Sequence, residues 1–512
     1  VSALLGGSYG RGLGNAAFVG QKDAVKDYAR EFENLLTLVR RNYPSEIDVE
    51  SVIYRGAIPS MLRELDPHSQ FLDPRAFARL REEQKGSYAG VGMQILSFKG
   101  RTIVDFPFPD TPSFRGGIRP EDEIAAVDGR STTNLSVEEV ARLVRGPRGS
   151  VVRLSLRRRG VDKQLEVKVV RAQIPRPSIP LASFVESGVG YVKLESFSET
   201  TDGEIDKALR KLSRKNISGL ILDLRDNRGG LLSSGVRVAD RFLPQGQTIV
   251  SHRGRASREK SYRVRQGHQG DLYPMVVLVN CGSASASEIV AGALQDHDRA
   301  LIVGSNTFGK GLVQSVVNLR SSPTALVLTT ARYYTPSGRL IQRPYRNVSA
   351  ADYYADACSP GYRPAKQEVS LTDNGRRVYS GGGITPDIEL SESLNPFQQR
   401  LQVERALQGF AQQYCLNRSE IPPDWEVNAA ILEPFRRYLY DERVAFTAEE
   451  IVDNRGYLQR GLKKHVNRAC VGWKAGLLAE VDQDPAVRRA LTLIPDASDL
   501  LRNARGTLAL KR

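Results

Sequence analysis

Residues 275–304 constrain the fold more than any other stretch, because they read as strand, turn, helix and strand in direct succession. Residues 275–280 form a short apolar run rich in valine, which is typical of a buried parallel strand. A turn of small residues follows, then a helix-like stretch at 288–295 and a second apolar run at 300–304. Two parallel strands joined by a helix make a βαβ unit. The sequence therefore predicts an α/β domain built on a parallel sheet.

The turn between the first strand and the helix carries three serines at alternate positions, Ser283, Ser285 and Ser287. It lies at the carboxyl end of a strand and the amino end of a helix, which is where open α/β sheets bind ligands. Backbone N–H groups at the start of a helix can also stabilise a developing oxyanion. A serine in this turn is therefore a candidate nucleophile.

A serine nucleophile needs a base, and Lys310 fits this role better than His297, the histidine nearest in sequence. His297 lies 12 residues beyond Ser285, roughly 18 Å along a continuous helix. Lys310 follows the second strand of the unit, so it emerges from the same edge of the sheet as Ser285. Gly309 and Gly311 let the backbone turn tightly around it. A lysine acts as a general base only where burial lowers its pKa toward neutrality.

Two other interpretations compete for this stretch. Residues 304–310 match G-x-x-x-x-G-K, most of a phosphate-binding loop, but that motif requires Ser or Thr next, and a helix after it. Gly311 occupies the required position, and the sequence LVQSVVNL that follows predicts a strand. The nucleotide-binding interpretation is disfavoured for these reasons. The plainer alternative is a turn of small residues that packs a helix onto the sheet.

The sequence GSASASEIVAGALQD followed by TFGKGLVQ resembles the carboxyl-terminal processing proteases, also called tail-specific proteases, which are serine endopeptidases with a Ser–Lys dyad. In that family the nucleophile is the middle serine of S-A-S-A-S-E and the lysine lies 25 positions on, as Lys310 does from Ser285. The resemblance implies Ser285 as nucleophile, Lys310 as base and Gln314 as the residue that orients the lysine. It implies no metal and no cofactor.

A second strand end carries glycines. Residues 219–224 read as a buried strand that runs into R-D-N-R-G-G. The family has an equivalent segment, D-L-R-x-N-x-G-G-L, and the resemblance implies that Gly230 and Ala286 donate the N–H groups of the oxyanion hole. Glycine permits the close backbone approach that such a donor requires, although an ordinary turn is the alternative. Asp223 and Asp226 lack a second cluster of ligands, so we assign them structural roles and predict no metal site.

Residues 87–172 resemble a PDZ domain. In such domains a glycine-containing loop presents N–H groups to a peptide's terminal carboxylate, and the peptide adds as a strand. The helix that lines the groove is expected at 136–144. Arg145 follows it and is interpreted either as a carboxylate ligand or coupling residue, or as a solvated arginine. The predicted carboxylate loop has four members: Gly90, Val91, Gly92 and Met93.

The fold class predicted for the 512-residue chain is α/β multidomain. The resemblance to the processing proteases spans residues 25–392. The predicted segments are a leader or anchor remnant at 1–22, an N-terminal helical segment at 23–86, the PDZ domain at 87–172, an α/β protease core with βαβ units at 173–395 and a helical extension at 396–512.

Two parts of this division carry further expectations. Residues 23–85 are expected to be helical, broken by the L-D-P-H-S motif at 65–69, where Asp-Pro predicts a turn. His68 is interpreted as a structural turn histidine, and the motif also resembles the processing proteases. Residues 343–380 are polar and tyrosine-rich and are expected to form a surface insertion. The extension 396–512 is either a self-association or adaptor-docking module or a set of helices packed on the core.

Charge and cysteine content bear on partners and location. The net charge of +15 comes without zinc-finger spacing or aromatic RNA-binding motifs, so we predict no nucleic-acid partner. Four cysteines have no metal spacing, and Cys358 with Cys415 is one candidate pair. The glycine-rich first twenty residues are interpreted as a signal-peptide or anchor remnant that would support membrane association, or as a disordered leader. By analogy with the family we expect a periplasmic or cell-envelope location.

The function predicted from the sequence is a serine endopeptidase that cleaves proteins at or near their C-termini. Its PDZ domain would recognise polypeptide substrates with exposed C-terminal tails. The alternative is a binding module, a PDZ scaffold with an inactive protease fold. The presence of Ser285, Lys310 and Gln314 together argues against that alternative.

Overall fold

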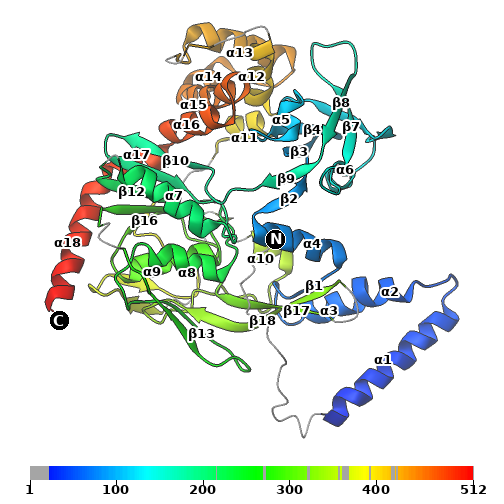
Figure 1. Ribbon diagram of the computed structural model, residues 1–512, viewed down its shortest axis with the longest axis vertical. Helices are drawn as coiled ribbons and strands as arrows, with labels where there is room; N and C mark the ends of the chain where they lie inside the picture. Colours follow the sequence, from blue (N-terminus) through cyan, green and yellow to red (C-terminus); the bar gives the residue numbers. More distant parts are fainter. Residues whose placement is uncertain are drawn as a thin grey trace.

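The computed structural model describes residues 22–214, 216–268, 272–319, 323–355, 358–359, 368–390, 394–416, 421–422 and 425–510. All but the last residue of the predicted leader, 1–22, lies outside these ranges. Figure 1 shows the α/β core with the domain at 87–172 and the C-terminal helices beside it, which confirms the predicted fold class.

A six-stranded sheet forms the centre of the core. The strand β10 pairs antiparallel with β11, and every other neighbouring pair is parallel. The unit β15–α9–β16, with α9 at Ala286–Asp296, is the βαβ unit that the sequence predicted, and it is confirmed. Across the sheet the strands are β10 (Leu181–Glu186), β11 (Val189–Lys193), β12 (Gly219–Asp223), β15 (Met275–Val279), β16 (Leu301–Gly304) and β21 (Ile388–Glu389).

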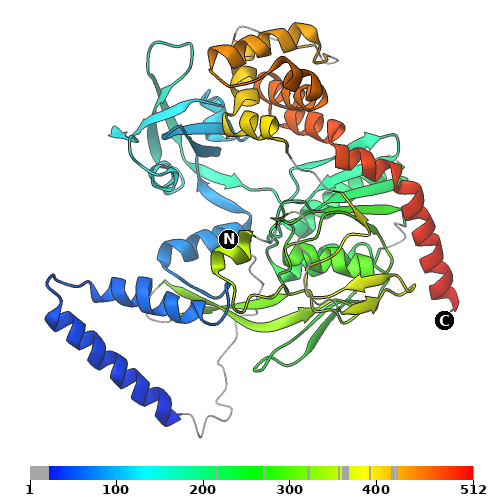
Figure 2. The ribbon, with the colours of Figure 1, turned by 180° about the vertical axis from the view of Figure 1, so that it is seen from behind.

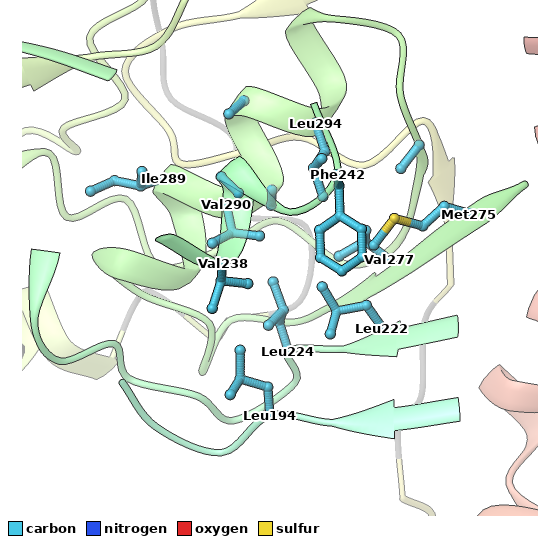
Figure 3. Close-up of a cluster of buried hydrophobic side chains, with 14 of the residues drawn as sticks. Leu194, Leu222, Leu224, Val238, Phe242, Met275, Val277, Ile289, Val290 and Leu294 are labelled. Carbon is cyan, nitrogen blue, oxygen red and sulfur yellow. The ribbon is translucent and has the colours of Figure 1, made fainter. Parts of the chain in front are cut away.

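Side chains of the central strands alternate between two apolar layers. On β15, Met275 and Val277 face one layer, while Val276 and Leu278 face the other. Because both faces are covered, β12 and β15 are buried along their whole length, which explains their continuous apolar sequence. Figure 3 shows the first layer, which three helices cover: α7 (Thr201–Ser213), α8 (Leu232–Asp240) and α9. C-terminal helices cover the second: α16 (Trp473–Gln483), α17 (Pro485–Thr492) and α18 (Ile494–Leu510).

A second, antiparallel sheet lies next to the core sheet and carries the segment after Lys310. β17 follows the sequence prediction for LVQSVVNL, and β18 runs on through Tyr334. The N-terminal strand β1 pairs with β18 and ties residues 70–72 to residues 325–327. The members are β1 (Gln70–Leu72), β13 (Thr248–Arg253), β14 (Lys260–Arg263), β17 (Leu312–Asn318) and β18 (Ala325–Tyr334).

The domain at 87–172 is a separate β-structure with its own apolar core. The first strand of its main sheet, β3, pairs only with β4 among the described residues, so the other edge of β3 is open. The helix α6 (Val137–Val144) packs beside that strand through Val140 and Val144. The strands are β3 (Met93–Phe98), β4 (Arg101–Pro107), β5 (Glu123–Val127), β6 (Arg130–Ser131), β7 (Val151–Arg157) and β8 (Leu165–Val170). The ribbon of β2 (Ser87–Gly90) and β9 (Ala172–Pro175) brings its entry and exit together.

The N-terminal segment is not helical throughout. A π-helical stretch at 52–57 interrupts the helical structure before the L-D-P-H-S motif, and residues 70–72 form β1 because β18 offers them an edge to pair with. The amphipathic α1 extends away from the rest of the chain (Figures 1 and 2). Its Tyr28 and Val25 are exposed. No described helix has the length and apolar content of a membrane span. The helices are α1 (Lys22–Asn42), α2 (Val49–Ser51), η1 (Val52–Ala57), α3 (Ile58–Arg63) and α4 (Pro74–Lys85).

The C-terminal extension makes two kinds of contact. Its earlier helices form a bundle with its own apolar core, and Arg405 in this bundle forms an ion pair with Asp105 of β4. Trp473, the first residue of α16, stacks on Phe106 of the same strand. Its later helices cover the second face of the core sheet. The first helical stretch of the extension is broken at Arg405, where φ is +51°. The bundle consists of α11 (Pro396–Val403), α12 (Ala406–Leu416), α13 (Ala429–Asp441), α14 (Ala448–Asp453) and α15 (Arg455–Val466).

The cysteines pair as Cys281–Cys358 and Cys415–Cys470. The candidate pair Cys358–Cys415 is therefore wrong, because the fold brings Cys281 next to Cys358 and Cys470 next to Cys415. The first disulfide ties the turn that contains Ser285 to the segment after α10 (Ala350–Ala355).

The surface insertion expected at 343–380 is only partly on the surface. Tyr353 of α10 is 2% exposed, and Arg343 lies over the rings of Tyr353 and Phe308. The expectation fails here because the guanidinium group of an arginine and aromatic rings can form cation–π contacts inside a protein, which offset the loss of hydration. The short hairpin β19 (Val369–Leu371) and β20 (Arg377–Tyr379) keeps exposed apolar side chains, as an insertion would.

Leu222 tests the two-layer packing. It is fully buried in the first layer (Figure 3), so Leu222→Ala is expected to lower the free energy of unfolding by about 2–5 kcal/mol. The matched change Leu371→Ala, on the exposed hairpin, is expected to cost less than about 0.5 kcal/mol. Chemical denaturation followed by tryptophan fluorescence measures both. Equal losses would contradict the assigned packing.

Candidate active site

The three serines of the nucleophile turn differ in what their hydroxyl groups do. Ser283 Oγ donates to the carbonyl of Leu224 at 2.8 Å, and Ser287 Oγ donates to the carbonyl of Asn227 at 2.8 Å. Ser285 Oγ is buried and has no hydrogen-bond partner among the described residues. Two serines therefore fasten the turn to the end of β12, and the middle one keeps an uncommitted hydroxyl.

Ser285 has a strained backbone. Its φ of +56° with ψ of −110° lies outside the regions that side-chain-bearing residues normally occupy. The strain is held in place because its N–H donates to Glu288 at 2.7 Å, while Ala284 N–H donates to Asn227 at 3.0 Å. The turn thus presents Ser285 at the amino end of α9, as the sequence predicted for a nucleophile.

Lys310 is buried on the loop that follows β16. Its side chain is 5% exposed, and its Nζ donates to Gln314 Oε1 at 2.9 Å. Burial lowers the pKa of Lys310 from 10.5 to about 8, with the charges of Asp66 and Glu288 working in the opposite direction. A lysine with such a pKa supplies a neutral amine at mildly alkaline pH, which is what a general base requires.

Glu288 connects the serine and the lysine, and sequence reasoning missed it. Its Oε2 accepts from the N–H of Ser285 at 2.7 Å and from that of Lys310 at 2.9 Å. Its Oε1 accepts from Thr307 Oγ1 at 2.6 Å and from Gly309 N–H at 2.7 Å. Burial raises the pKa of Glu288, and these four donors oppose the rise. The S-x-x-E pattern of a helix N-terminus was the signal that could have revealed it.

Tyr333 makes a second connection between the same two residues. Its hydroxyl lies 3.2 Å from the carbonyl oxygen of Ser285 and 2.5 Å from that of Lys310. Tyr333 is fully buried at the end of β18. The serine and lysine loops are therefore joined twice: their N–H groups donate to the carboxylate of Glu288, and their carbonyl groups accept from the hydroxyl of Tyr333.

The glycine segment predicted to complete an oxyanion hole lies directly against the nucleophile turn. A Cβ on Gly229 would lie 2.9 Å from Ser285 Cβ and 3.0 Å from Ala286 N. A Cβ on Gly230, whose φ is +149°, would lie 2.0 Å from the carbonyl oxygen of Phe197. Neither the Gly230 nor the Ala286 N–H donates a hydrogen bond to another described residue. A cavity of about 650 Å³ opens on both glycines.

Gln314 lies between Lys310 and the L-D-P-H-S turn. Its Nε2 donates to the carbonyl oxygen of His68 at 2.6 Å. The His68 ring is buried against α10, with Nε2 3.0 Å from the Tyr353 hydroxyl. Burial, helped by the charges of Lys310 and Arg343, lowers the pKa of His68 to about 2, so the ring stays neutral.

His297, Asp223 and Asp226 lie apart from this chemistry. His297 is at the far end of α9, where its ring nitrogens contact Asp373 and the carbonyl of Thr248. Burial would raise the pKa of Asp223, but its partners Lys193 and Arg225 prevail and bring the pKa to about 2. Asp226 accepts a hydrogen bond from Asn280. Within the described ranges no cluster of three or more His, Cys, Asp or Glu side chains could hold a metal ion.

The predicted peptide-binding residues lie at the open edge of the domain at 87–172. Val91 and Met93 are buried in its core, and Gly92 adopts a φ of +84°. A Cβ there would lie 2.3 Å from Thr111, so the loop requires glycine. Gly90 ends β2. Arg145 follows α6 and contacts α4 and its flank, through an ion pair with Glu82 at 3.4 Å and a stack on the ring of Tyr88.

Comparison with known protein families agrees with this architecture. Residues 188–347 match Peptidase family S41, and residues 109–158 match the PDZ domain family. The fold and these matches together define a PDZ-containing serine peptidase.

The relatives carry the assignment further. The chain is 39% identical over 327 residues to the carboxy-terminal-processing protease of Bartonella bacilliformis, covering 63% of this chain and 74% of the relative. It is 30% identical over 405 residues to the carboxy-terminal processing protease CtpB of Bacillus subtilis, covering 78% and 84%. The chain belongs to Peptidase family S41, among the carboxy-terminal-processing proteases. It is also similar to the solved photosystem II D1 C-terminal processing protease, with 27% identity, coverage of 70% and 92%, and a TM-score of 0.39.

Glu288→Gln tests the carboxylate connection. A glutamine keeps the shape but presents an NH₂ group where one oxygen stood, so two of the four donors lose their acceptor, at about 1–3 kcal/mol each. We expect a lower melting temperature and a kcat reduced by about 100-fold, because a small displacement of reacting groups costs that much. Glu450→Gln, at the same position of the exposed capping box of α14, is the matched control. Equal behaviour of the two variants would contradict the role given to Glu288.

Proposed function

We propose that Ser285 and Lys310 are the catalytic dyad of this peptidase. One observation carries the proposal: of three serines in the turn, only Ser285 has an uncommitted hydroxyl among the described residues, and its N–H and that of Lys310 share one carboxylate oxygen. The lowered pKa of Lys310 supports the role of base.

The reaction follows from these roles. Neutral Lys310 accepts the proton of Ser285 Oγ as the oxygen attacks the scissile carbonyl carbon. The negative oxygen of the tetrahedral intermediate is held by the N–H groups of Gly230 and Ala286. The lysine ammonium then protonates the leaving amine of the substrate. The neutral amine of Lys310 next deprotonates a water molecule, and this water attacks the acyl-enzyme and releases the acyl group from the serine. Gln314 holds the lysine amine by accepting one of its N–H groups. None of these steps draws on a metal or cofactor.

We propose that the PDZ domain selects polypeptide substrates by their exposed C-terminal tails. The open edge of β3 supports strand addition, and the loop of Gly92 supports capture of the terminal carboxylate. Arg145 would couple an occupied groove to α4, since it contacts Glu82 of that helix. The cavity beside Gly230 would receive the tail on its way to Ser285.

We propose that the enzyme works outside the cytoplasm, in the periplasm or cell envelope. Two disulfides support an oxidising compartment, because structural disulfides persist where thiols are not kept reduced. The leader at 1–22 would provide targeting or a membrane anchor. In the extension 396–512, the exposed Tyr440 and Val452 offer apolar contacts to an adaptor or a second copy of the chain.

Casein or tail-peptide cleavage distinguishes the enzyme from the inactive scaffold. Ser285→Ala and Lys310→Ala are each expected to reduce kcat by at least about 1000-fold, because each removes a group that acts in the transition state. Both variants should still bind a tail peptide. A scaffold would give wild-type cleavage no faster than that of the two variants. Mass spectrometry of proteins retained by Ser285→Ala identifies the substrates.

The pH profile tests the base. Protonated Lys310 cannot accept a proton, so kcat/KM is expected to rise with pH and level off above an apparent pKa of about 8. Stopped assays with one tail peptide across the pH range measure this limb. An apparent pKa of about 6.5 for the rise of kcat/KM, which is the ordinary pKa of histidine, would point instead to an imidazole base.

Two peptides of one sequence test tail recognition. One ends in a free carboxylate and the other in a carboxamide. The carboxamide is expected to lose about tenfold or more in kcat/KM, because it forfeits a charge-assisted hydrogen bond to the loop around Gly92. Equal kcat/KM values for the two peptides would remove the carboxylate from the recognition mechanism.

A further inference from the structure

The turn at residues 66–69, hereafter the 66–69 turn, is an unusually well-fixed piece of the N-terminal segment. Asp66 Oδ1 accepts from the N–H groups of His68 and Ser69, each at 2.8 Å, and its Oδ2 accepts from Ser69 Oγ at 2.7 Å. Ser69 Oγ in turn accepts from the N–H of Thr329 on β18 at 3.1 Å. One carboxylate thus shapes the turn, and one hydroxyl docks it on the second sheet.

This turn reaches the catalytic lysine in two steps. The carbonyl oxygen of His68 accepts from Gln314 Nε2 at 2.6 Å, and Gln314 Oε1 accepts from Lys310 Nζ at 2.9 Å. Gln314 is 2% exposed, so water does not replace either bond. Its first bond joins His68 and Gln314, which are 246 positions apart in the sequence.

The first of these bonds decides which way the Gln314 amide faces. A backbone carbonyl only accepts hydrogen bonds, so the amide must direct its NH₂ group to His68 and its oxygen to Lys310. An amide oxygen can accept an N–H from the amine in either protonation state. In the neutral state the N–H that is donated to Gln314 leaves the lone pair of the amine directed away from Gln314. An amide oxygen carries no full charge, so it favours the ammonium form less than a carboxylate would.

We propose that the 66–69 turn is a positioning element of the peptidase, which fixes the Gln314 amide through the His68 carbonyl and thereby orients the Lys310 amine. The proposal rests on the assignment of Lys310 as the base. The described hydrogen bonds lead from the turn to Lys310 through Gln314.

The turn is held from its other side as well. The His68 ring meets the hydroxyl groups of Tyr353 and Tyr354, and Tyr354 also donates to the carbonyl of Pro67 at 2.9 Å. These tyrosines belong to α10, and the disulfide Cys281–Cys358 connects the chain just after α10 to the nucleophile turn. A displacement of the turn would therefore have to displace α10, which keeps the His68 carbonyl in one place.

The groups around Lys310 determine how a change in the turn affects its titration. They are Asp66 and His68 on the turn, Glu288 on α9 and Tyr333 on β18, while Arg343 and Tyr353 act on the other side of His68. Of these, the Asp66 and Glu288 charges raise the pKa of Lys310. Removing the charge of Asp66 should therefore lower the pKa of Lys310 and move the acid limb of kcat/KM to lower pH.

A double-mutant cycle in the full chain tests the path, with Asp66→Ala and Gln314→Ala alone and together. If the turn acts through Gln314, Asp66→Ala reduces kcat by about 10- to 100-fold in the wild-type background, with little change in KM. In the Gln314→Ala background the same substitution costs less than about twofold, because its target is already absent. An equal fold-loss in both backgrounds would overturn the proposal.

The conservative variant Asp66→Asn guards against loss of folding. Asparagine can keep the acceptor for His68 and Ser69 N–H groups but loses the charge, so it is expected to retain the melting temperature and shift the acid limb to lower pH. An unshifted limb with a reduced kcat would mean a merely structural role and would also overturn the proposal. Asp73→Asn is the control, because Asp73 caps α4 from an exposed position and has no hydrogen bond toward Gln314. Full activity of Lys310→Ala would instead reject the dyad itself, a different result.

Discussion

The buried carboxylate of Glu288 is the interaction on which the active site depends. Four donors from two loops converge on its two oxygens, and each loop carries one member of the proposed dyad. A carboxylate is suited to this role because it accepts several hydrogen bonds and donates none. The strained backbone of Ser285 can persist because this contact and those of Asn227 hold the turn on both sides.

Around that centre the protein assembles its site from distant parts of the chain. The core sheet supplies the serine turn and the glycine segment at the carboxyl ends of its strands, as α/β sheets generally do. The second sheet supplies Gln314 and Tyr333, and the N-terminal segment supplies the carbonyl of His68. The lysine loses its hydration in this enclosure, which lowers its pKa to about 8. Burial is therefore part of the chemistry.

The C-terminal extension contacts both the PDZ domain and the core sheet. Its bundle contacts the PDZ domain through Arg405, and α16 does so through Trp473. Its last helices complete the second apolar layer of the core sheet. The ion pair of Arg225 with Asp484 lies beside the strand end that leads to Gly230. The extension thus spans the domain that would read a tail and the sheet that would cut it (Figure 2).

The sequence by itself determined the βαβ unit, the PDZ domain and the family, because apolar periodicity and short glycine and serine motifs are local properties of the chain. It also singled out Ser285 and Lys310. Only the tertiary structure decided that Glu288, Tyr333 and His68 join them, which cysteines pair, and that Tyr353 is buried. Those contacts connect residues far apart in sequence, and each depends on which polar group finds its partner once water is excluded, a choice that no local pattern encodes.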